Sequence, residues 1–268
     1  MVMDKPKKKP LLISHRGAHK EAPENSCRAF EIALEDGVDG IETDVQLSSD
    51  GVPVLFHNAT ACHVTGDRKR ISSYTCEQLQ GLDIGKKGEC IGIPTLSEAL
   101  ATFGGHTRLL IEIKSRKADR ASGRSGELTD KVVAAIRCLP VGIRSAISIL
   151  SFDPDVLSRA SRAAPTQKCV LNTDGTGSWC VPVAELVRGS VVLDFLSAVC
   201  LEKKRLSARV VAWAHGRDLQ VFTYCCNTRR QVERAVALGV DGIMSDKPGW
   251  LVGLFKPHAK GPVQSAKR

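Results

Sequence analysis

Short apolar runs alternate with amphipathic helical patterns along almost the whole chain. The first run, LLISH (11–15), leads into a helical pattern near 25–36 that Gly37 ends. Two parallel strands need a crossover between them, so this alternation is typical of parallel βαβ units. The other runs are DGIETDV (39–45), VPVLFH (52–57), RLLIEIK (108–114), SAISILS (145–151), QKCVLN (167–172), SVVLDF (190–195), LQVFTYCC (219–226) and DGIMS (241–245). Further helical patterns lie near 96–103, 126–138, 154–163, 182–188, 201–215 and 228–238.

These runs fit an eight-stranded barrel if one of them lies outside it. The turn Ser49-Asp50-Gly51 joins the second run to VPVLFH and is too short for a helical crossover. We therefore expect VPVLFH to be the return arm of a hairpin, which brings His57 back near the end of the second strand. The remaining runs predict an α/β fold, a (β/α)8 TIM barrel, with a small insertion (about 58–94) after that hairpin. A doubly wound sheet is disfavoured, because no run is followed by GxGxxG and no GxxxxGK[ST] occurs.

The formal net charge of +9 is concentrated at the two ends of the chain. Residues 1–10 contribute +3 and residues 251–268 contribute +4, which leaves +2 for everything between them. We expect one TIM-barrel domain at 11–250, flanked by a basic flexible N-terminal tail and a basic C-terminal tail. A basic groove is not indicated, so we expect no nucleic acid partner.

The cysteines and the N-terminal sequence indicate in which cellular compartment the protein is expected to lie. The 10 cysteines show no CxxC spacing, and we expect them to be reduced thiols. Only Leu11-Leu12-Ile13 follow the N-terminal lysines before His15, whereas a signal peptide needs roughly 7–15 apolar residues there. No apolar run approaches the roughly 20 residues of a membrane span. These features predict a cytoplasmic protein with no stable membrane insertion.

Acidic residues share the inner face of two expected strands. Side chains alternate along a strand, so Glu42 and Asp44 face one way while their β-branched neighbours face the other. In a barrel the branched face packs under the helices, so both carboxylates point at the axis. The segment Ile111-Glu112-Ile113-Lys114 repeats this pattern. Buried like charges cost several kcal/mol each, and a hard dication held by oxygen ligands offsets that cost. The alternative is that Glu42 and Asp44 lie at a solvent-exposed edge of the sheet and bind no metal ion.

Two histidines end apolar runs at the same expected rim. His15 and His57 could serve as an acid and a base near neutral pH, although a lone histidine at a strand end is more often structural. Arg16 offers a guanidinium whose geometry matches phosphate oxygens. A dication, Arg16, Lys114 and two imidazoles around one cavity indicate phosphoryl chemistry. One histidine would activate the attacking hydroxyl, and the other would protonate the leaving alcohol.

Several ordered motifs resemble one known family, the glycerophosphodiester phosphodiesterases. His15-Arg16-Gly17, followed after five residues by Pro23-Glu24-Asn25-Ser26, is similar to that family's HRG-x5-PENT opening. IETDVQLSSDGVPVLFHN resembles its E-x-D-V segment that runs to an HD pair, and IEIK resembles its ElK motif. Further similar segments are SFDPDVL, IPTLSEAL, VFTYCCN and GVDGIMSDKP, so the resemblance spans roughly residues 11 to 248.

The resemblance implies a barrel enzyme that hydrolyses glycerophosphodiesters, such as glycerophosphocholine or glycerophosphoethanolamine, to sn-glycerol 3-phosphate and an alcohol. It implies the following roles: Glu42, Asp44 and Glu112 as ligands of Mg²⁺ or Ca²⁺, His15 and His57 as the acid/base pair, and Arg16 and Lys114 as phosphate contacts. Glu24 and Asn25 lie in the PEN motif, where we favour a helix cap and brace over direct catalysis.

Four positions depart from the family pattern, of which Ser26 and Ser245 merely replace threonines and are expected to have little effect. Asn58 stands where the family usually has Asp, which removes a negative charge beside His57. Tyr224 replaces the usual Trp, which keeps an aromatic pocket wall and adds a hydroxyl. The three acids, the two histidines, the arginine and the lysine are all present.

Three other functions compete with this hypothesis. A lysophospholipase D or sphingomyelinase D-like enzyme on the same barrel would want an apolar docking rim, and the chain is only 4% aromatic. A non-catalytic phosphate-binding scaffold would be expected to have lost a catalytic residue. An isomerase or aldolase could use Lys114, but the three acids would then have no role. The sequence does not distinguish water from a substrate hydroxyl as the nucleophile, and it predicts no oligomeric state.

Overall fold

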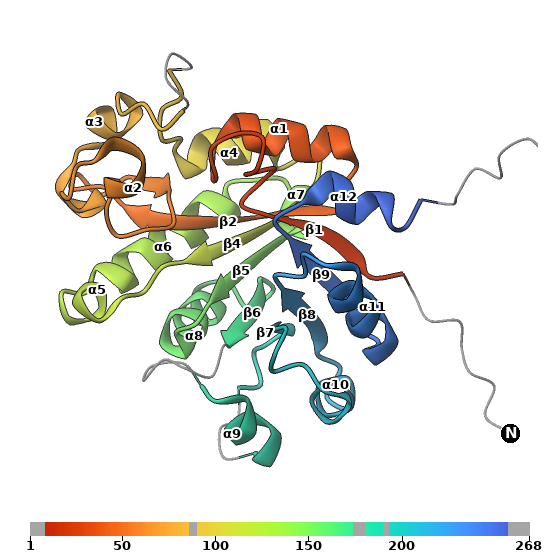
Figure 1. Cartoon of the computed structure of the whole chain (residues 1–268). Coiled ribbons are helices and arrows are strands. Elements are labelled where there is room, and N and C mark those ends of the chain that lie inside the picture. The colour runs from red at the N-terminus through yellow and green to blue at the C-terminus, as the bar shows by residue number, and fades with distance from the viewer. Residues whose placement is uncertain (1–8, 86–89, 174–180, 190–192, 257–268) are drawn as a thin grey trace, which may run out of the picture.

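The computed structural model describes residues 9–85, 90–173, 181–189 and 193–256. Its centre is a closed barrel of parallel strands (Figure 1), in the order β1-β9-β8-β7-β6-β5-β4-β2, which the pairing of β1 with β2 closes. The predicted (β/α)8 barrel is therefore confirmed. The barrel strands are β1 (Leu11–His15), β2 (Gly40–Leu47), β4 (Arg108–Ile113), β5 (Ile147–Ser151), β6 (Lys168–Thr173), β7 (Ala198–Glu202), β8 (Gln220–Tyr224) and β9 (Gly242–Ser245).

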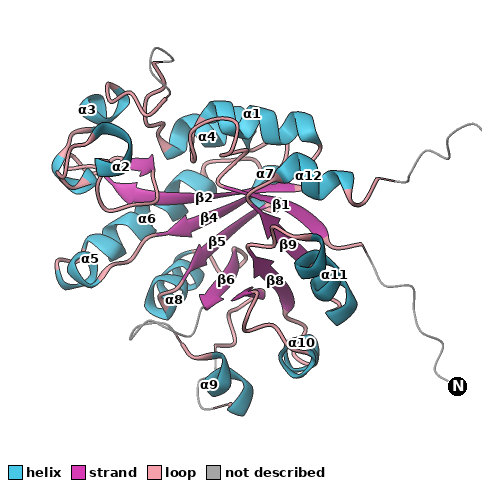
Figure 2. Ribbon diagram, viewed as in Figure 1, coloured by secondary structure: helices cyan, strands magenta, loops and turns pink. Residues whose placement is uncertain are grey.

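Helices cover the outside of the barrel, so that strands lie within a ring of helices (Figure 2). The helices that follow or lie between the barrel strands in the sequence are α1 (Cys27–Asp36), α4 (Leu96–Phe103), α5 (Lys117–Ala121), α6 (Arg124–Arg137), α7 (Val141–Arg144), α8 (Pro154–Ala163), α9 (Val183–Arg188), α10 (Ala208–His215), α11 (Arg229–Leu238) and α12 (Pro248–Gly253). No helix in these described ranges has the length and apolar character needed to cross a membrane.

Local sequence signals explain where the helices begin and end. Ser26 caps α1 by accepting a hydrogen bond from the amide of Ala29, and Gly37 ends the helix in the left-handed conformation. Thr95 and Glu98 form a reciprocal capping box at the start of α4. These are the signals that place α1 and α4 at their predicted positions.

The predicted hairpin is confirmed. Strand β3 (Pro53–Leu55) pairs antiparallel with the end of β2, and Val45 lies opposite Leu55. The chain then forms α2 (Cys62–Thr65), the 3₁₀ helix η1 (Ile71–Ser73) and α3 (Cys76–Gln80), which lie beside the ends of β2 and β3 (Figure 1). This region has an apolar cluster of its own, formed by Val54, Phe56, Ala61, Ile71, Tyr74, Leu79, Ile84 and Ile93.

The position predicted for the sixth barrel strand was wrong. The apolar run SVVLDF (190–195) was expected to form it, but the strand is β7 at Ala198–Glu202, and residues 193–197 form turns and bends. Residues 190–192 lie outside the described part. Strand pairing determines which segment forms β7, because Ala198 lies opposite Val170 of β6 and Gln220 of β8. The helix expected near 201–215 accordingly begins only at Ala208, where Ser207 caps it.

Two apolar layers surround the strands. Inside the barrel lie Ile13, Leu110, Leu150, Val170, Ala198, Cys200, Phe222 and Met244. Between the strands and the helices lies the larger core, which includes Ile41, Val45, Ile111 and Ile113. The branched residues of β2 and β4 therefore face the helices, as predicted, and their acidic neighbours face the barrel axis.

The ends of the domain were predicted at residues 11 and 250. Residue 250 falls inside α12, whose Leu251 and Val252 are buried. The rest of the expected tails, residues 1–8 and 257–268, lies outside the described residues.

Candidate active site

A cavity of about 400 Å³ opens at the carboxyl ends of the barrel strands. Charged and polar side chains line one part of it, and apolar and aromatic side chains line the other. The lining residues are His15, Arg16, Glu42, His57, Glu112, Lys114, Leu150, Phe152, Asn172, Cys200, Glu202, Lys204, Tyr224 and Met244. This is the face at which barrel enzymes place their active sites.

Strand register brings the three predicted acidic ligands together. Asp44 of β2 lies opposite Glu112 of β4, and Glu42 lies opposite His15 of β1. Glu42, Asp44 and Glu112 are buried, with 2%, 0% and 7% of their surface exposed. One carboxylate oxygen from each lies within 4.8 Å of the other two. A buried cluster of three oxygen donors is a donor set that a hard dication prefers.

Two cations partly balance this acidic cluster. Lys114 Nζ lies 2.6 Å from Asp44 Oδ1 and also contacts Glu112 Oε1. Arg16 Nε lies 3.0 Å from Asp44 Oδ2. Three carboxylates and two cations leave one net negative charge in the cavity, so the cluster still attracts a proton or a cation.

The cavity shifts the pKa values of these groups in opposite directions. Burial, together with the charges of Asp44 and Glu112, holds the pKa of Glu42 well above its usual range. Burial alone would also raise the pKa of Asp44, but Lys114 and Arg16 lower it far below the ordinary value. Glu42 is therefore the carboxylate whose charge most lacks a partner, and a bound dication would supply one.

Asn25 and Glu24 hold this arrangement from the loop before α1. The Asn25 amide donates to Asp44 Oδ2 at 2.9 Å, and its oxygen accepts from Thr43 Oγ1 at 2.8 Å and from the Asp44 amide at 3.1 Å. Glu24 Oε2 accepts from Arg16 at 3.1 Å. Neither Asn25 nor Glu24 lines the cavity, and their contacts are those of a brace.

The turn after β1 explains the sequence His15-Arg16-Gly17. Gly17 has φ 79°, and a Cβ at this position would lie 2.7 Å from the Cβ of Ala29. The turn therefore requires glycine, because α1 packs directly against it. Arg16 also has a positive φ of 60°, and its amide donates to the backbone oxygen of Glu42 at 2.9 Å.

His57 enters the cavity from the loop after β3. Its Nδ1 lies 2.9 Å from Asn58 Oδ1, and this contact assigns the Nδ1 proton and leaves Nε2 as an acceptor. Arg116 holds the loop by donating to the backbone oxygen of His57 at 2.7 Å. Burial, followed by the charge of Lys114, lowers the pKa of His57 to about 4. The imidazole is therefore neutral at neutral pH.

His15 has a different partner, which the sequence reasoning missed. Its Nδ1 lies 2.7 Å from Asp246 Oδ1, directly after β9, and its Nε2 lies 3.9 Å from Glu42 Oε2. His19 Nε2 lies 3.1 Å from the same Asp246 oxygen. Burial alone would raise the pKa of Asp246, but its hydrogen bonds with His15 and His19 hold it far below its usual range. The two predicted catalytic histidines thus have unlike partners, an amide and a carboxylate.

Two further cavity residues were also missed. Asn172, in β6, donates to Glu112 Oε2 at 3.0 Å. Phe152, directly after β5, meets the Tyr224 ring edge-on, with the ring centroids 6.4 Å apart, so Tyr224 is part of an aromatic wall, as predicted. Both lie at the carboxyl end of a strand, and that position was a signal which could have identified them.

Comparisons with known proteins agree with this geometry. Residues 15–250 match the model of the Glycerophosphoryl diester phosphodiesterase family. The glycerophosphodiester phosphodiesterase of Caldanaerobacter subterraneus subsp. tengcongensis is 30% identical over 260 residues, which cover 92% of this chain and 98% of the relative. The enzyme of that name from Bacillus altitudinis is 26% identical, with 88% and 94% covered.

Solved structures share the fold. The Oleispira antarctica phosphodiesterase, in complex with the product sn-glycerol-3-phosphate, aligns with a TM-score of 0.76 at 23% identity, over 91% of this chain and 96% of that chain. The glycerophosphodiester phosphodiesterase from Thermotoga maritima aligns with a TM-score of 0.74 at 22% identity, over 92% and 99%. The family match spans nearly the whole barrel, and this chain belongs to the glycerophosphoryl diester phosphodiesterase family, as an enzyme with glycerophosphodiester phosphodiesterase activity.

Proposed function

We propose that the protein hydrolyses small glycerophosphodiesters, such as glycerophosphocholine or glycerophosphoethanolamine, to sn-glycerol 3-phosphate and an alcohol, with a divalent cation and two histidines. One observation carries the proposal. The buried cluster of Glu42, Asp44 and Glu112 lies in the same cavity as His15 and His57, whose hydrogen-bond partners suit opposite proton-transfer roles.

The charge of the cavity suits a phosphodiester only when a dication is bound. Without one, Arg16 and Lys114 are already paired with the acidic cluster, so little positive charge is left to attract a phosphate anion. Mg²⁺ or Ca²⁺ held by the acidic cluster would polarise a phosphoryl oxygen and neutralise its charge. Arg16 and Lys114 line the cavity beside that cluster, where they can contact the remaining phosphate oxygens.

His57 is suited to act as the base. Its Nδ1–H donates a hydrogen bond to Asn58 Oδ1, so the lone pair of Nε2 is free to accept a proton from the attacking hydroxyl. The lowered pKa of about 4 keeps the imidazole neutral and ready at neutral pH. Arg116 fixes the loop by its hydrogen bond to the backbone oxygen of His57.

His15 is suited to act as the acid. The carboxylate of Asp246 accepts a hydrogen bond from Nδ1, which fixes the ring and directs Nε2 toward the cavity, 3.9 Å from Glu42 Oε2. When Nε2 gives its proton to the leaving alcohol, the ring becomes neutral and keeps its hydrogen bond to Asp246. Asp246 is thus a positioning residue that acts through His15.

The roles can be separated by changing the leaving group. In a p-nitrophenyl ester of glycerol phosphate the leaving group is p-nitrophenolate, which departs without help from an acid. In glycerophosphocholine the leaving oxygen is that of choline, which needs a proton. We expect His15→Ala to lower kcat by roughly 10²–10⁴ on glycerophosphocholine but far less on the p-nitrophenyl ester. His57→Ala should impair both substrates alike. The reverse pattern would exchange the two roles, and two unimpaired variants would refute the proposal.

The exposed surface bears on the alternative that the protein is a lipid-hydrolysing enzyme. Val64 and Val141 are the exposed large apolar residues among those described, and they belong to α2 and α7, on different parts of the surface. An apolar docking rim is therefore not apparent in the described part, which favours small head-group substrates over lysophospholipids. Comparing kcat/KM for glycerophosphocholine and lysophosphatidylcholine tests this choice, and preference for the lipid would overturn it.

We also propose a cytoplasmic location. The nine cysteines that the structure describes are all free thiols, including the half-buried Cys27 and the buried Cys169. Free thiols in this number are typical of a reducing compartment. Localisation of a tagged full-length chain, by fractionation with periplasmic or secreted markers as controls, tests the proposal.

A further inference from the structure

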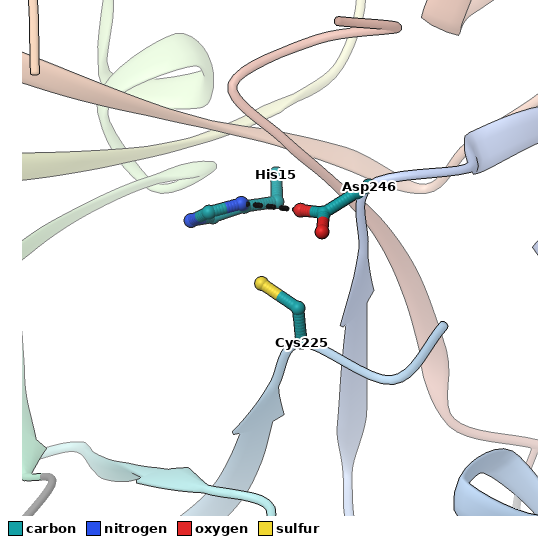
Figure 3. Close-up of side chains that lie close together, drawn as sticks. All are labelled: His15, Cys225 and Asp246. Carbon is teal, nitrogen blue, oxygen red and sulfur yellow. Dashed lines mark hydrogen bonds and ion pairs between the residues drawn. The ribbon is translucent and has the colours of Figure 1, made fainter. Parts of the chain in front are cut away.

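A second group of metal-ligating side chains adjoins the acidic cluster. It consists of His15 at the end of β1, Cys225 directly after β8 and Asp246 directly after β9. One donor atom from each lies within 4.8 Å of the other two. Figure 3 shows the Cys225 sulfur directed toward the gap between the His15 ring and the Asp246 carboxylate.

The donor set differs in kind from the acidic cluster. Glu42, Asp44 and Glu112 offer only carboxylate oxygens, which suit hard cations. His15, Cys225 and Asp246 offer a nitrogen, a sulfur and an oxygen, a combination that selects Zn²⁺ or Cd²⁺ over Mg²⁺ or Ca²⁺. The two groups meet at His15, whose Nε2 lies 3.9 Å from Glu42 Oε2.

The observed spacing is close to what a tetrahedral ion requires. Zinc bonds of roughly 2.0–2.3 Å place tetrahedral ligand atoms about 3.3–3.8 Å apart. The His15 to Asp246 contact of 2.7 Å would widen as the ion replaces its proton, and the sulfur would move inward by rotation about the Cys225 side chain. These three residues are neither fully buried nor exposed, so an ion can reach them and water can fill the fourth position.

The alternative role for this cysteine, as a reactive thiol, is poorly supported. Burial and the nearby charge of Asp246 both raise the pKa of the Cys225 thiol, so the nucleophilic thiolate is disfavoured in the ion-free protein. A bound dication would replace the thiol proton, which leaves to solvent.

We propose that His15, Cys225 and Asp246 form a binding site for a thiophilic dication such as Zn²⁺, and that its occupancy inhibits the enzyme. The inhibitory half rests on the proposed function of His15. With Nδ1 bound to an ion, the ring keeps only its Nε2 proton, and releasing that proton would leave an imidazolate. His15 then no longer serves as an acid, and Asp246 no longer positions it.

Cadmium titration of the purified full chain tests binding without measuring activity. Excess Mg²⁺ occupies hard sites, and ultraviolet absorbance reports each bond between cadmium and a thiolate. We expect the wild type to show a saturable band that Cys225→Ser loses, with Cys225→Ala as a second substitution. Cys138→Ser is the matched control, because Cys138 is an exposed cysteine at the end of α6, and it should keep the saturable band. Equal bands in wild type and both Cys225 variants would overturn the site.

Inhibition is measured separately on glycerophosphocholine hydrolysis at saturating Mg²⁺. Loss of a ligand in Cys225→Ser should raise the Zn²⁺ concentration for half-inhibition by at least about tenfold. Even the loss of a residue that only hydrogen-bonds to a metal ligand lowers metal affinity by about that factor. An unchanged Zn²⁺ sensitivity would refute the inhibitory role. If the chain hydrolyses no glycerophosphodiester, the proposed function fails while the absorbance band still decides whether the site exists.

Discussion

Replacing Asp246 by Asn tests how His15 is positioned. Both carboxylate oxygens accept a hydrogen bond, Oδ1 from His15 at 2.7 Å and Oδ2 from Asn227 at 2.5 Å, and His19 Nε2 lies 3.1 Å from Oδ1. An amide must therefore turn its NH₂ group toward at least one donor, and the substitution also removes the negative charge beside His15. Shape and volume are nearly unchanged, so the effect isolates charge and hydrogen bonding.

The size of the effect follows from these contacts. A hydrogen bond to a charged group is worth about 1.5–3 kcal/mol, and roughly 1.4 kcal/mol in the barrier changes a rate tenfold. If the His15 contact is realised in the transition state, Asp246→Asn should lower kcat about 10- to 150-fold. KM should change little, because Asp246 does not line the cavity.

The assay is steady-state release of glycerol 3-phosphate from glycerophosphocholine. Asp241→Asn is the matched control, because Asp241 accepts from His215 Nε2 at 2.9 Å but lies just before β9, at the opposite end of the barrel. It should leave kcat unchanged. An Asp246→Asn variant with wild-type kcat, or an equal loss in both variants, would refute the positioning role.

Three further predictions follow from the site and the turn beside it. Excess chelator should abolish activity and added Mg²⁺ or Ca²⁺ should restore it; full activity in chelator would contradict the proposed role of the acidic cluster. Asn58→Asp places a carboxylate beside His57, so the pKa of His57, about 4 in the native chain, should rise by about 1 unit or more. Because the base must be neutral, the fall in kcat/KM on acidification should move to higher pH by the same amount, and an unmoved profile would argue against His57 as the base. Gly17→Ala should cost about 2–5 kcal/mol in urea unfolding, from a left-handed backbone and overlap with Ala29. Gly239→Ala, with φ 81° and open space at its Cβ, should cost only about 1–2 kcal/mol, and equal losses would refute the packing argument.

Much of the fold could be predicted because local chemistry and topology agreed. Helix α4 begins and ends at the predicted residues, and the capping box at its start is formed by two residues close in sequence, Thr95 and Glu98. The inward direction of Glu42 and Asp44 followed from strand alternation alone, given a barrel whose outer face is apolar. Strand β7 could not be located, because two apolar runs lie almost adjacent and only pairing with β6 and β8 selects the second.

The site was predictable only where each residue belongs to a local motif. The acidic cluster needs just the register of β2 and β4, in which Asp44 lies opposite Glu112. The partner of His15 is 231 residues away in sequence, and no local pattern connects them. Asp246 was not predicted as a site residue, although it directly follows the predicted strand 241–245, because its pairing with His15 depends on contacts across the closed barrel.

Barrel closure itself therefore completes the candidate acid. Strand β1 pairs with β9 through Ser14 and Ser245, so the next residue on each strand, His15 and Asp246, emerges side by side at the rim. The base has a different origin, because His57 and Asn58 are neighbours in sequence and the hairpin of β2 and β3 suffices to position them. One imidazole is thus positioned by a local hairpin and the other by pairing between the first and last barrel strands. An open barrel would keep the proposed base and the acidic cluster of β2 and β4 but would separate the proposed acid from Asp246, so under this proposal activity requires the closed barrel.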